Sequence, residues 1–286
     1  MLTFVDSQLE TIINLLENYP MAKSAQPELF ATGPVIVDGI QYFAADGIDI
    51  NLVLASATFT DWLNEVDRKG FDINWILFQS VDMFGPPESA RVGFLKFKAE
   101  VFDGQGKALP GIVFARGGSV AVLAVLECEG EEHVVLTVQP RLSTGRFDFV
   151  EVCAGMLDGS GNFVGVVAKE IKEELGIEVQ RAELVDLTAL SGIDGGIYMS
   201  PGGCPETIRF FAFRRSVSRA ELDSMNGRCT GELAEGEQIV LKIVKLHELL
   251  KLNDAKSQLA LTFYLRFQSQ VMEAQAAYAA LRDGAA

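Results

Sequence analysis

The stretch from Gly155 to Ile177 constrains the chain most, because it joins a glycine-containing loop to a short amphipathic helix. Gly176 follows the predicted helix at the position where a helix C-terminus favours a residue with positive φ. Apolar residues recur three and four positions apart, the spacing of one helix face, at Val164, Val167, Ala168, Ile171 and Leu175. The pattern therefore predicts a short helix that packs one face against a core.

Three glutamates, Glu170, Glu173 and Glu174, lie within about one turn on the other side of this helix. Like charges four residues apart destabilise an isolated helix, so the sequence predicts a positive group among them. Carboxylate oxygens are ligands that Mg²⁺ and Mn²⁺ prefer, and these ions also hold substrate phosphates. The alternative interpretation is an ordinary solvated helix face.

The frame around the glutamates resembles the Nudix box, G-x5-E-x7-R-E-U-x-E-E-x-G-U, in which U is aliphatic. The matching residues are Gly155, Glu170, Ile171, Glu173, Glu174, Gly176 and Ile177. Two positions depart from the pattern, because Gly161 replaces the first glutamate and Lys169 replaces the arginine. Lys169 keeps the positive charge but lacks the planar, two-pronged donor geometry of arginine.

Within the Nudix superfamily, five further segments are similar to the plant ADP-sugar diphosphatases. These segments are residues 81–85, 91–98, 110–117, 154–158 and 200–204. The resemblance covers roughly residues 70 to 270. It implies an α/β fold: an α/β/α Nudix sandwich with a mixed sheet over residues 114–286, preceded by a smaller α+β, β-rich domain over residues 1–113. It also implies that the first domain helps to form a homodimer.

The resemblance implies Mg²⁺-dependent hydrolysis of a nucleoside diphosphate sugar, such as ADP-glucose or ADP-ribose, into AMP and a sugar or ribose phosphate; Mn²⁺ is a possible substitute. The metal ligands it implies are Glu170, Glu173, Glu174 and the backbone carbonyl of Ala154. Gly155, Lys169 and Gly176 are expected to support the box. Metal ions that bridge the diphosphate and the carboxylates would neutralise charge and activate a water.

Two acidic residues outside the box are candidates for the general base, and the choice between them stays open. Glu206 takes the acidic position of the loop that begins at Ser200, whereas Glu237 matches the position that other relatives use. Arg141 matches an arginine that contacts the diphosphate in ADP-sugar hydrolases, and Arg116 is a second candidate. Adenine stacking is expected from an aromatic residue, with Phe84, Phe114, Trp62 and Trp75 as possibilities.

The composition of the chain limits the kinds of molecule that it can bind and the compartments in which it is expected. A net charge of −15 over 286 residues argues against nucleic acid, and it requires a cation or local arginines at any phosphate site. Four separated cysteines predict free thiols in a reducing compartment, and two histidines give little support to a histidine-built metal site or triad. The longest apolar run, residues 120–126, is too short for a bilayer. We expect a soluble intracellular protein without a membrane role, cytoplasmic, or plastid if a transit peptide was removed.

Periodicity and turn residues also predict the secondary structure. Helices are expected at residues 6–18, 60–69 and 255–281, besides the glutamate helix. Strands are expected at residues 71–82, 91–102, 120–126, 134–138, 147–152, 182–190, 207–214 and 238–245.

Two other functions remain open from the sequence. The same chemistry could act on a UDP-sugar, NADH, a dinucleotide polyphosphate or coenzyme A. The departures at Lys169 and Pro205, where an acidic residue is usual, would also suit a Nudix fold that binds a nucleotide sugar with little turnover.

Overall fold

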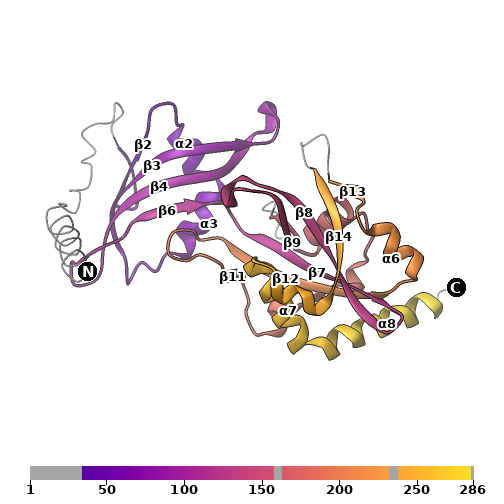
Figure 1. Cartoon of the computed structure of the whole chain (residues 1–286). Coiled ribbons are helices and arrows are strands. Elements are labelled where there is room, and N and C mark those ends of the chain that lie inside the picture. Colours follow the sequence, from indigo (N-terminus) through magenta and orange to yellow (C-terminus); the bar gives the residue numbers. More distant parts are fainter. Residues whose placement is uncertain (1–33, 158–162, 232–237, 285–286) are drawn as a thin grey trace, which may run out of the picture. The chain divides into compact units, whose positions relative to one another are not determined.

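A computed structural model of the chain describes residues 34–157, 163–231 and 238–284 (Figure 1). The chain divides into two compact units, Met1–Phe114 and Ala115–Ala286. The predicted helix at residues 6–18 lies outside the described residues, as do Gly161 and Glu237. Among the described helices, none is both long and apolar enough to cross a membrane.

The first unit is built on a six-stranded sheet in the order β1-β2-β3-β4-β5, with β6 also paired to β4. Its strands are β1 (Val35–Val37), β2 (Ile40–Ala44), β3 (Asp72–Phe84), β4 (Arg91–Phe102), β5 (Ala108–Leu109) and β6 (Ile112–Ala115). Within residues 34–114 these strands are accompanied by the helices α2 (Ile50–Leu54), α3 (Ala57–Glu65) and the 3₁₀ helix η2 (Pro87–Ser89). The predicted strands at 71–82 and 91–102 are confirmed as β3 and β4.

The predicted helix at 60–69 begins and ends earlier than expected, as α3. Ser56 is its N-cap and accepts a hydrogen bond from the amide of Phe59, which fixes the start of the helix three residues before Thr60. Phe59 is fully buried and lies edge-on to Tyr42, Phe78 and Phe97, with ring centroids 5.0–5.9 Å away. This aromatic cluster is the centre of the first unit.

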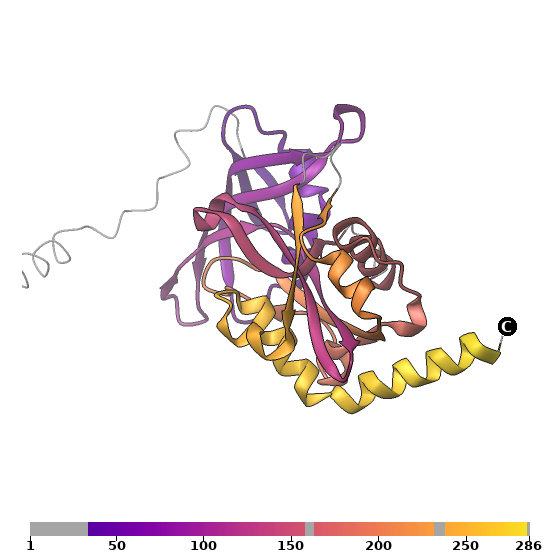
Figure 2. The ribbon, with the colours of Figure 1, turned by 45° about the vertical axis from the view of Figure 1, so that its right-hand side comes forward.

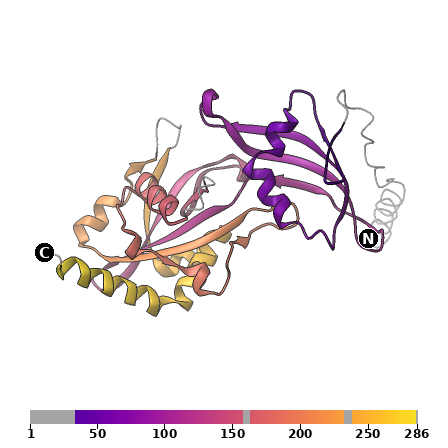
Figure 3. The ribbon, with the colours of Figure 1, turned by 180° about the vertical axis from the view of Figure 1, so that it is seen from behind.

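The second unit contains an eight-stranded mixed sheet in the order β10-β12-β7-β9-β8-β14-β13, with β11 also paired to β12 (Figures 1 and 3). The strands are β7 (Ser119–Cys128), β8 (Glu131–Arg141), β9 (Arg146–Met156), β10 (Val185–Asp186), β11 (Ile197–Tyr198), β12 (Thr207–Ser216), β13 (Cys229–Thr230) and β14 (Ile239–Lys245). Only the β12–β7 pairing among these is parallel in the described part of the sheet. The predicted strands at 120–126, 134–138, 207–214 and 238–245 are confirmed.

Helices cover both faces of this sheet. Alternate residues of the central strand β7 point to opposite faces, so this strand contributes to the hydrophobic core on each side. Val120, Val122 and Ala124 pack with residues of α4 (Phe163–Glu170), the π-helical turn η4 (Ile171–Leu175) and α6 (Arg219–Met225). Ala121 and Leu123 pack with α7 (Ala255–Arg266) and α8 (Gln268–Gly284), the two yellow helices of Figure 2. The predicted α/β/α sandwich with a mixed sheet is therefore confirmed.

The other helices in the described part of the second unit are short: the 3₁₀ helices η3 (Leu142–Thr144), η5 (Arg181–Glu183) and η7 (Leu246–Lys251), and α5 (Leu187–Leu190). The predicted strand at 182–190 is wrong, because this segment holds η5, the two residues of β10, and α5. Asp186 accepts a hydrogen bond from the amide of Ala189 at 2.8 Å and so caps α5. The predicted continuous helix at 255–281 is interrupted at Phe267, where α7 ends and α8 begins.

Candidate active site

The candidate site begins where strand β9 separates two neighbouring strands. Near their connecting turn, β7 and β8 pair directly, and β9 then lies between them, pairing with β8 through residues 146–152 and with β7 through residues 153–156. Ala154 lies opposite Ala121, and Gly155 lies opposite Val120. We expected a loop at Gly155, but the strand continues to Met156. The backbone of Ala154 and Gly155 is thereby held at the centre of the sheet.

The glutamate segment packs over this end of β9 as α4 followed by η4. Val166, Val167, Ile171 and Leu175 are buried in the core on that face, which confirms the predicted amphipathic helix. The segment ends in a π-helical turn instead of the expected α-helical one, and such turns occur frequently at functional sites.

A C-cap glycine and hydrogen bonds from the segment around β13 fix the C-terminal end of η4. Gly176 has φ of +63°, as predicted for a C-cap, and Arg228 donates a hydrogen bond to the carbonyl of Leu175. A Cβ at position 176 would lie 2.6 Å from the guanidinium of Arg228, so the glycine also leaves room for this cation. A cation at a helix C-terminus is favourable for the helix dipole. Thr230 and Gly231, from the β13 region, donate to the carbonyls of Glu174 and Glu173 respectively.

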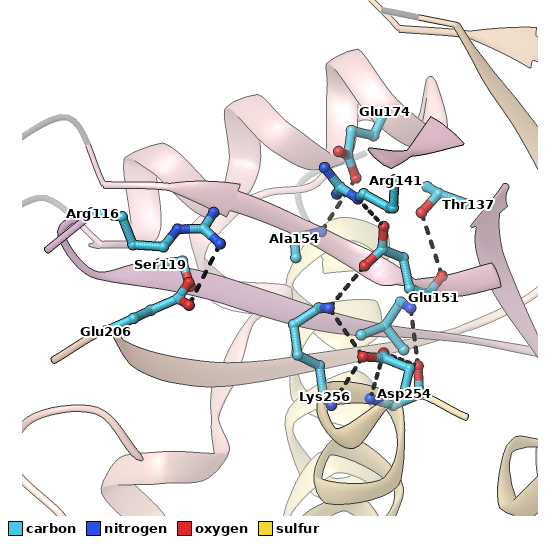
Figure 4. A network of polar contacts seen from close by, with 12 residues as sticks. Arg116, Ser119, Thr137, Arg141, Glu151, Ala154, Glu174, Glu206, Asp254 and Lys256 are labelled. Carbon is cyan, nitrogen blue, oxygen red and sulfur yellow. Dashed lines mark hydrogen bonds and ion pairs between the residues drawn. The ribbon is translucent and has the colours of Figure 1, made fainter. Parts of the chain in front are cut away.

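Glu174 points back to β9 and is buried, with an exposed fraction of 5%. Its Oε2 accepts a hydrogen bond from the amide of Ala154 at 3.2 Å (Figure 4). The pKa of Glu174 is raised to about 8, mainly by burial; the charges of Glu170 and Glu151 act in the same direction, and hydrogen bonds from Cys153 and Ala154 oppose the shift. A buried carboxylate beside other carboxylates is a strong ligand for a cation.

Glu170 lies directly against the backbone of Gly155. A Cβ at position 155 would lie 1.9 Å from the carboxyl carbon of Glu170, so only glycine leaves space for this side chain. Glu173 turns to another partner, because its carboxylate forms an ion pair with Lys169 at 3.4 Å. The structure thus brings Glu170 and Glu174 together beside β9 and places Glu173 with the lysine that replaces the box arginine.

The oxygen donors at this place match the chemistry of a hard divalent cation. They are the carboxylates of Glu170 and Glu174 and the backbone carbonyl of Ala154, and all are ligand types that Mg²⁺ and Mn²⁺ take. Within residues 34–157, 163–231 and 238–284, no three His, Cys, Asp or Glu side chains form a metal-binding group. Cys153 is a buried neighbour, and its burial, followed by the carboxylate of Glu174, raises the pKa of its thiol. All four cysteines are free thiols.

The candidate base Glu206 lies at the start of β12 and is held by two side chains (Figure 4). Ser119 donates a hydrogen bond to its Oε1 at 3.0 Å, and Arg116 forms an ion pair with its Oε2 at 3.6 Å. Two residues that the sequence predicts separately, Arg116 and Glu206, are therefore in contact. Ser119 had no recognisable signal in the sequence, and it lies opposite Met156 of β9.

The second predicted arginine, Arg141, belongs to a separate network that sequence reasoning missed (Figure 4). Its Nε donates to the buried carboxylate of Glu151 at 2.6 Å, and Nζ of Lys256 bonds the other oxygen of Glu151 at 2.7 Å. Lys256 also contacts Asp254, the N-cap of α7. The capping sequence Asp-x-x-Ser at 254–257 was a visible signal for the helix start, but not for its contact with β9.

The aromatic candidates for adenine all belong to the first unit. Trp62 packs on Phe97 with ring centroids 4.6 Å apart, and Trp75 is buried in the core. Phe84 and Phe114 each pack against Phe94. Of these, Phe114 is the more exposed at 40%.

A model of the NUDIX domain matches residues 116–264, which contain every site residue described above from the second unit. The chain is also 38% identical to Nudix hydrolase 14, chloroplastic, of Arabidopsis thaliana over 243 residues, covering 81% of this chain and 76% of that protein. The chain belongs to the Nudix hydrolase family. A solved structure described as an ADP compounds hydrolase is similar with a TM-score of 0.45 and 15% identity, covering 72% of this chain and 98% of the other.

One of the two departures from the Nudix box, Lys169, lies within the described residues. Lys169 retains one role available to a cation at its position, because it pairs with a box glutamate four residues later. Gly161 lies outside the described residues. Of the matching positions, Gly155 leaves space for Glu170, Ile171 is buried in the core, and Gly176 has the positive φ of a C-cap.

Proposed function

We propose that the chain hydrolyses the diphosphate bond of ADP-sugars such as ADP-glucose and ADP-ribose, releasing AMP and a sugar or ribose phosphate, with Mg²⁺ as the cofactor and Mn²⁺ as an alternative. The observation that carries this proposal is the buried carboxylate of Glu174, which lies with Glu170 against the end of β9. The choice of ADP-sugars rests on the sequence segments that resemble the plant enzymes.

In this proposal Glu170, Glu174 and the carbonyl of Ala154 hold the cation, while Glu173 and Lys169 order the exposed side of the turn. When bound, the cation neutralises the diphosphate and lowers the pKa of the attacking water. The chain itself contributes a rigid frame: β9 lies between two strands, and Arg228 and Thr230 hold the far end of η4. Preorganised ligands of this kind need little rearrangement when the substrate arrives.

Glu206 is the preferred candidate for the base among the described residues, with Glu237 as the alternative. Ser119 and Arg116 contact the two oxygens of Glu206, so the carboxylate must separate from Arg116 before that oxygen can accept a proton from water. The substrate diphosphate is the natural competitor for Arg116, and Ser119 would still orient the released carboxylate. Replacing the true base should lower kcat by about 10²–10⁴-fold, and comparing Glu206→Gln with Glu237→Gln identifies it.

The experiment that tests the proposal is a panel of nucleoside diphosphate derivatives with Mg²⁺ or Mn²⁺ and detection of released AMP. The wild type should release AMP from ADP-glucose or ADP-ribose, and Glu174→Gln should lose most of the rate. Glu178→Gln is a matched control, because the Glu178 side chain is exposed. Its carboxylate forms an ion pair with Lys172 at 2.9 Å. Unchanged turnover in Glu174→Gln would refute the proposed role of Glu174 in catalysis. Faster hydrolysis of a UDP-sugar, NADH, a dinucleotide polyphosphate or coenzyme A would show that the substrate is not an ADP-sugar.

A nucleotide-sugar-binding protein with weak turnover is the second candidate, and the presence of Lys169 in place of the box arginine favours it. An arginine could hold two carboxylate oxygens with a fixed fork, which a lysine cannot. Tight binding of ADP-ribose without AMP release under any divalent cation would support this candidate. In that case Lys169→Arg should produce measurable turnover.

We further propose a homodimer that involves the first unit, and either a cytoplasmic or a plastid location. Sedimentation of the full chain should give about twice the monomer mass of 31.1 kDa. A monomer at micromolar concentration would refute the dimer. Imaging of a tagged full-length protein distinguishes the two locations.

A further inference from the structure

A network of four charged side chains connects the N-terminus of α7 to strand β9 (Figure 4). Glu151 of β9 accepts a hydrogen bond from Arg141 at 2.6 Å and one from Lys256 at 2.7 Å. Lys256 also donates to Asp254 at 3.0 Å. The residues come from the β8–β9 hairpin and from a helix more than a hundred positions later, and they lie on the second unit alone.

Glu151 is the buried centre of this network. Its exposed fraction is 1%, and its carboxylate is shared by two cations, one on each oxygen. A charge buried to this extent must be neutralised, because isolated buried charges are very costly. Arg141 alone could meet that requirement, so the second cation, Lys256, calls for an explanation.

The other carboxylate in the network, Asp254, already has partners. It caps α7, accepting hydrogen bonds from the amide and the hydroxyl of Ser257 at 3.0 and 2.7 Å. The positive end of the helix dipole adds to this stabilisation. Burial lowers the pKa of Lys256, but the carboxylates of Glu151 and Asp254 outweigh it and raise the pKa overall, which keeps the ammonium charged. The positively charged Lys256 can therefore neutralise the carboxylate of Glu151.

Arg141 differs from Lys256 in its access to solvent. The side chain of Arg141 is 39% exposed, whereas that of Lys256 is 20% exposed. Its bond to Glu151 uses Nε, and a guanidinium has further N–H donors on its two terminal nitrogens. Arg141 can thus be oriented by Glu151 and still present a fork of donors to an anion.

We infer that Lys256 is a positioning residue for substrate binding: by neutralising Glu151 from α7, it leaves the charge of Arg141 available to the diphosphate of the substrate. Without Lys256, Arg141 would be the remaining neutralising partner of Glu151 in the network, and its attraction for a phosphate would fall. This inference rests on the proposed function, because it concerns the same diphosphate. It assigns a role to a residue on the opposite face of the sheet from the glutamate helix.

The test measures kcat, KM and the dissociation constant of α,β-methylene-ADP, a diphosphate that is not hydrolysed at the bridging bond. Lys256→Met should raise both KM and the dissociation constant roughly tenfold, the difference between a charged and a neutral hydrogen-bond donor, with a smaller change in kcat. Lys256→Arg should restore both values. Lys251→Met is the matched control, because Lys251 pairs with Glu248 on the surface and should leave both unchanged.

A double variant separates the electrostatic role from a merely structural one. If Lys256 acts by neutralising Glu151, Glu151→Gln in the Lys256→Met background should recover most of the lost affinity, because the buried charge is gone. A failure of this recovery would overturn the inference, as would an unchanged dissociation constant in Lys256→Met. If the wild type neither binds α,β-methylene-ADP nor hydrolyses any panel compound, the proposed function fails and the inference fails with it.

Discussion

The burial of Glu174 leads to a quantitative prediction about stability. Its pKa is about 8 in the folded protein against an ordinary value of 4.5. In the unfolded chain the group releases its proton near pH 4.5, whereas in the folded chain it keeps the proton until about pH 8. The folded state is therefore favoured by this group at low pH, and the advantage is lost as pH rises from 4.5 to 8. At about 1.4 kcal/mol per pKa unit, the full effect is about 5 kcal/mol.

The substitution Glu174→Gln isolates the contribution of this carboxyl group to the pH dependence of the unfolding free energy. The amide oxygen of glutamine can still accept the hydrogen bond from Ala154, but the side chain does not ionise. Without metal, the unfolding free energy of the wild type minus that of the variant should fall by roughly 2–5 kcal/mol between pH 5 and pH 9. Urea unfolding followed by circular dichroism measures it, because Trp62 and Trp75 both lie in the first unit and fluorescence would report mainly on that unit.

Added Mg²⁺ should reverse the effect in the wild type only. A cation that binds the folded state stabilises it in proportion to the logarithm of its concentration above the dissociation constant, and an ionised Glu174 is the form that binds. The control is Glu178→Gln, which should follow the wild type at every pH. A difference between wild type and Glu174→Gln that stays constant from pH 5 to pH 9 would show that Glu174 is neither buried nor coupled to Glu170 in solution.

Three further variants test how the site is held in place. Gly155→Ala should displace the carboxylate of Glu170 and lower kcat/KM about 100-fold while the circular dichroism spectrum is retained; full activity would contradict the close approach. Ser257→Ala should leave the amide of Val152 unsatisfied and lower the unfolding free energy by about 1–3 kcal/mol in urea, and no change would refute that bond. Arg228→Met should lower the melting temperature through loss of about 1 kcal/mol at the helix C-terminus, and an unchanged value would argue against this cap.

The sequence predicted those parts of the fold in which a local pattern and burial agree. The run at 120–126 is apolar throughout, as expected for a strand such as β7 that is covered on both faces. The glutamate helix has one apolar face, which packs into the core on one side of the sheet. Prediction failed at 182–190, where side chains act on the backbone. Asp186 caps α5, and the hydroxyl of Thr188 accepts a hydrogen bond from Phe210 at 2.7 Å, so a segment with strand-like composition becomes a turn and a short helix.

The candidate site divides in the same way. The spacing of Glu170, Glu174 and Gly155 is visible in the sequence because these residues lie within 20 positions of one another. Glu151 and Lys256 are 105 positions apart, and their contact exists because the N-terminus of α7 meets β9 across the sheet. In the sequence, Glu151 is not distinguishable from an ordinary polar residue of a strand that precedes the Nudix box. Its partners become apparent only when the topology is known.

The cations around the site are paired with carboxylates, which limits the attraction that this acidic protein offers to a polyanion. Arg116 is paired with Glu206, Lys169 with Glu173, and Arg141 with Glu151. Each pair is close to neutral, so these cations alone do not reverse the field of a chain with net charge −15. A diphosphate can recruit the arginines only if the carboxylates they leave are neutralised in another way. In the proposed function Lys256 would do this for Glu151, Ser119 would orient the Glu206 carboxylate, and a divalent cation would neutralise Glu170 and Glu174, so we expect substrate binding to require the metal.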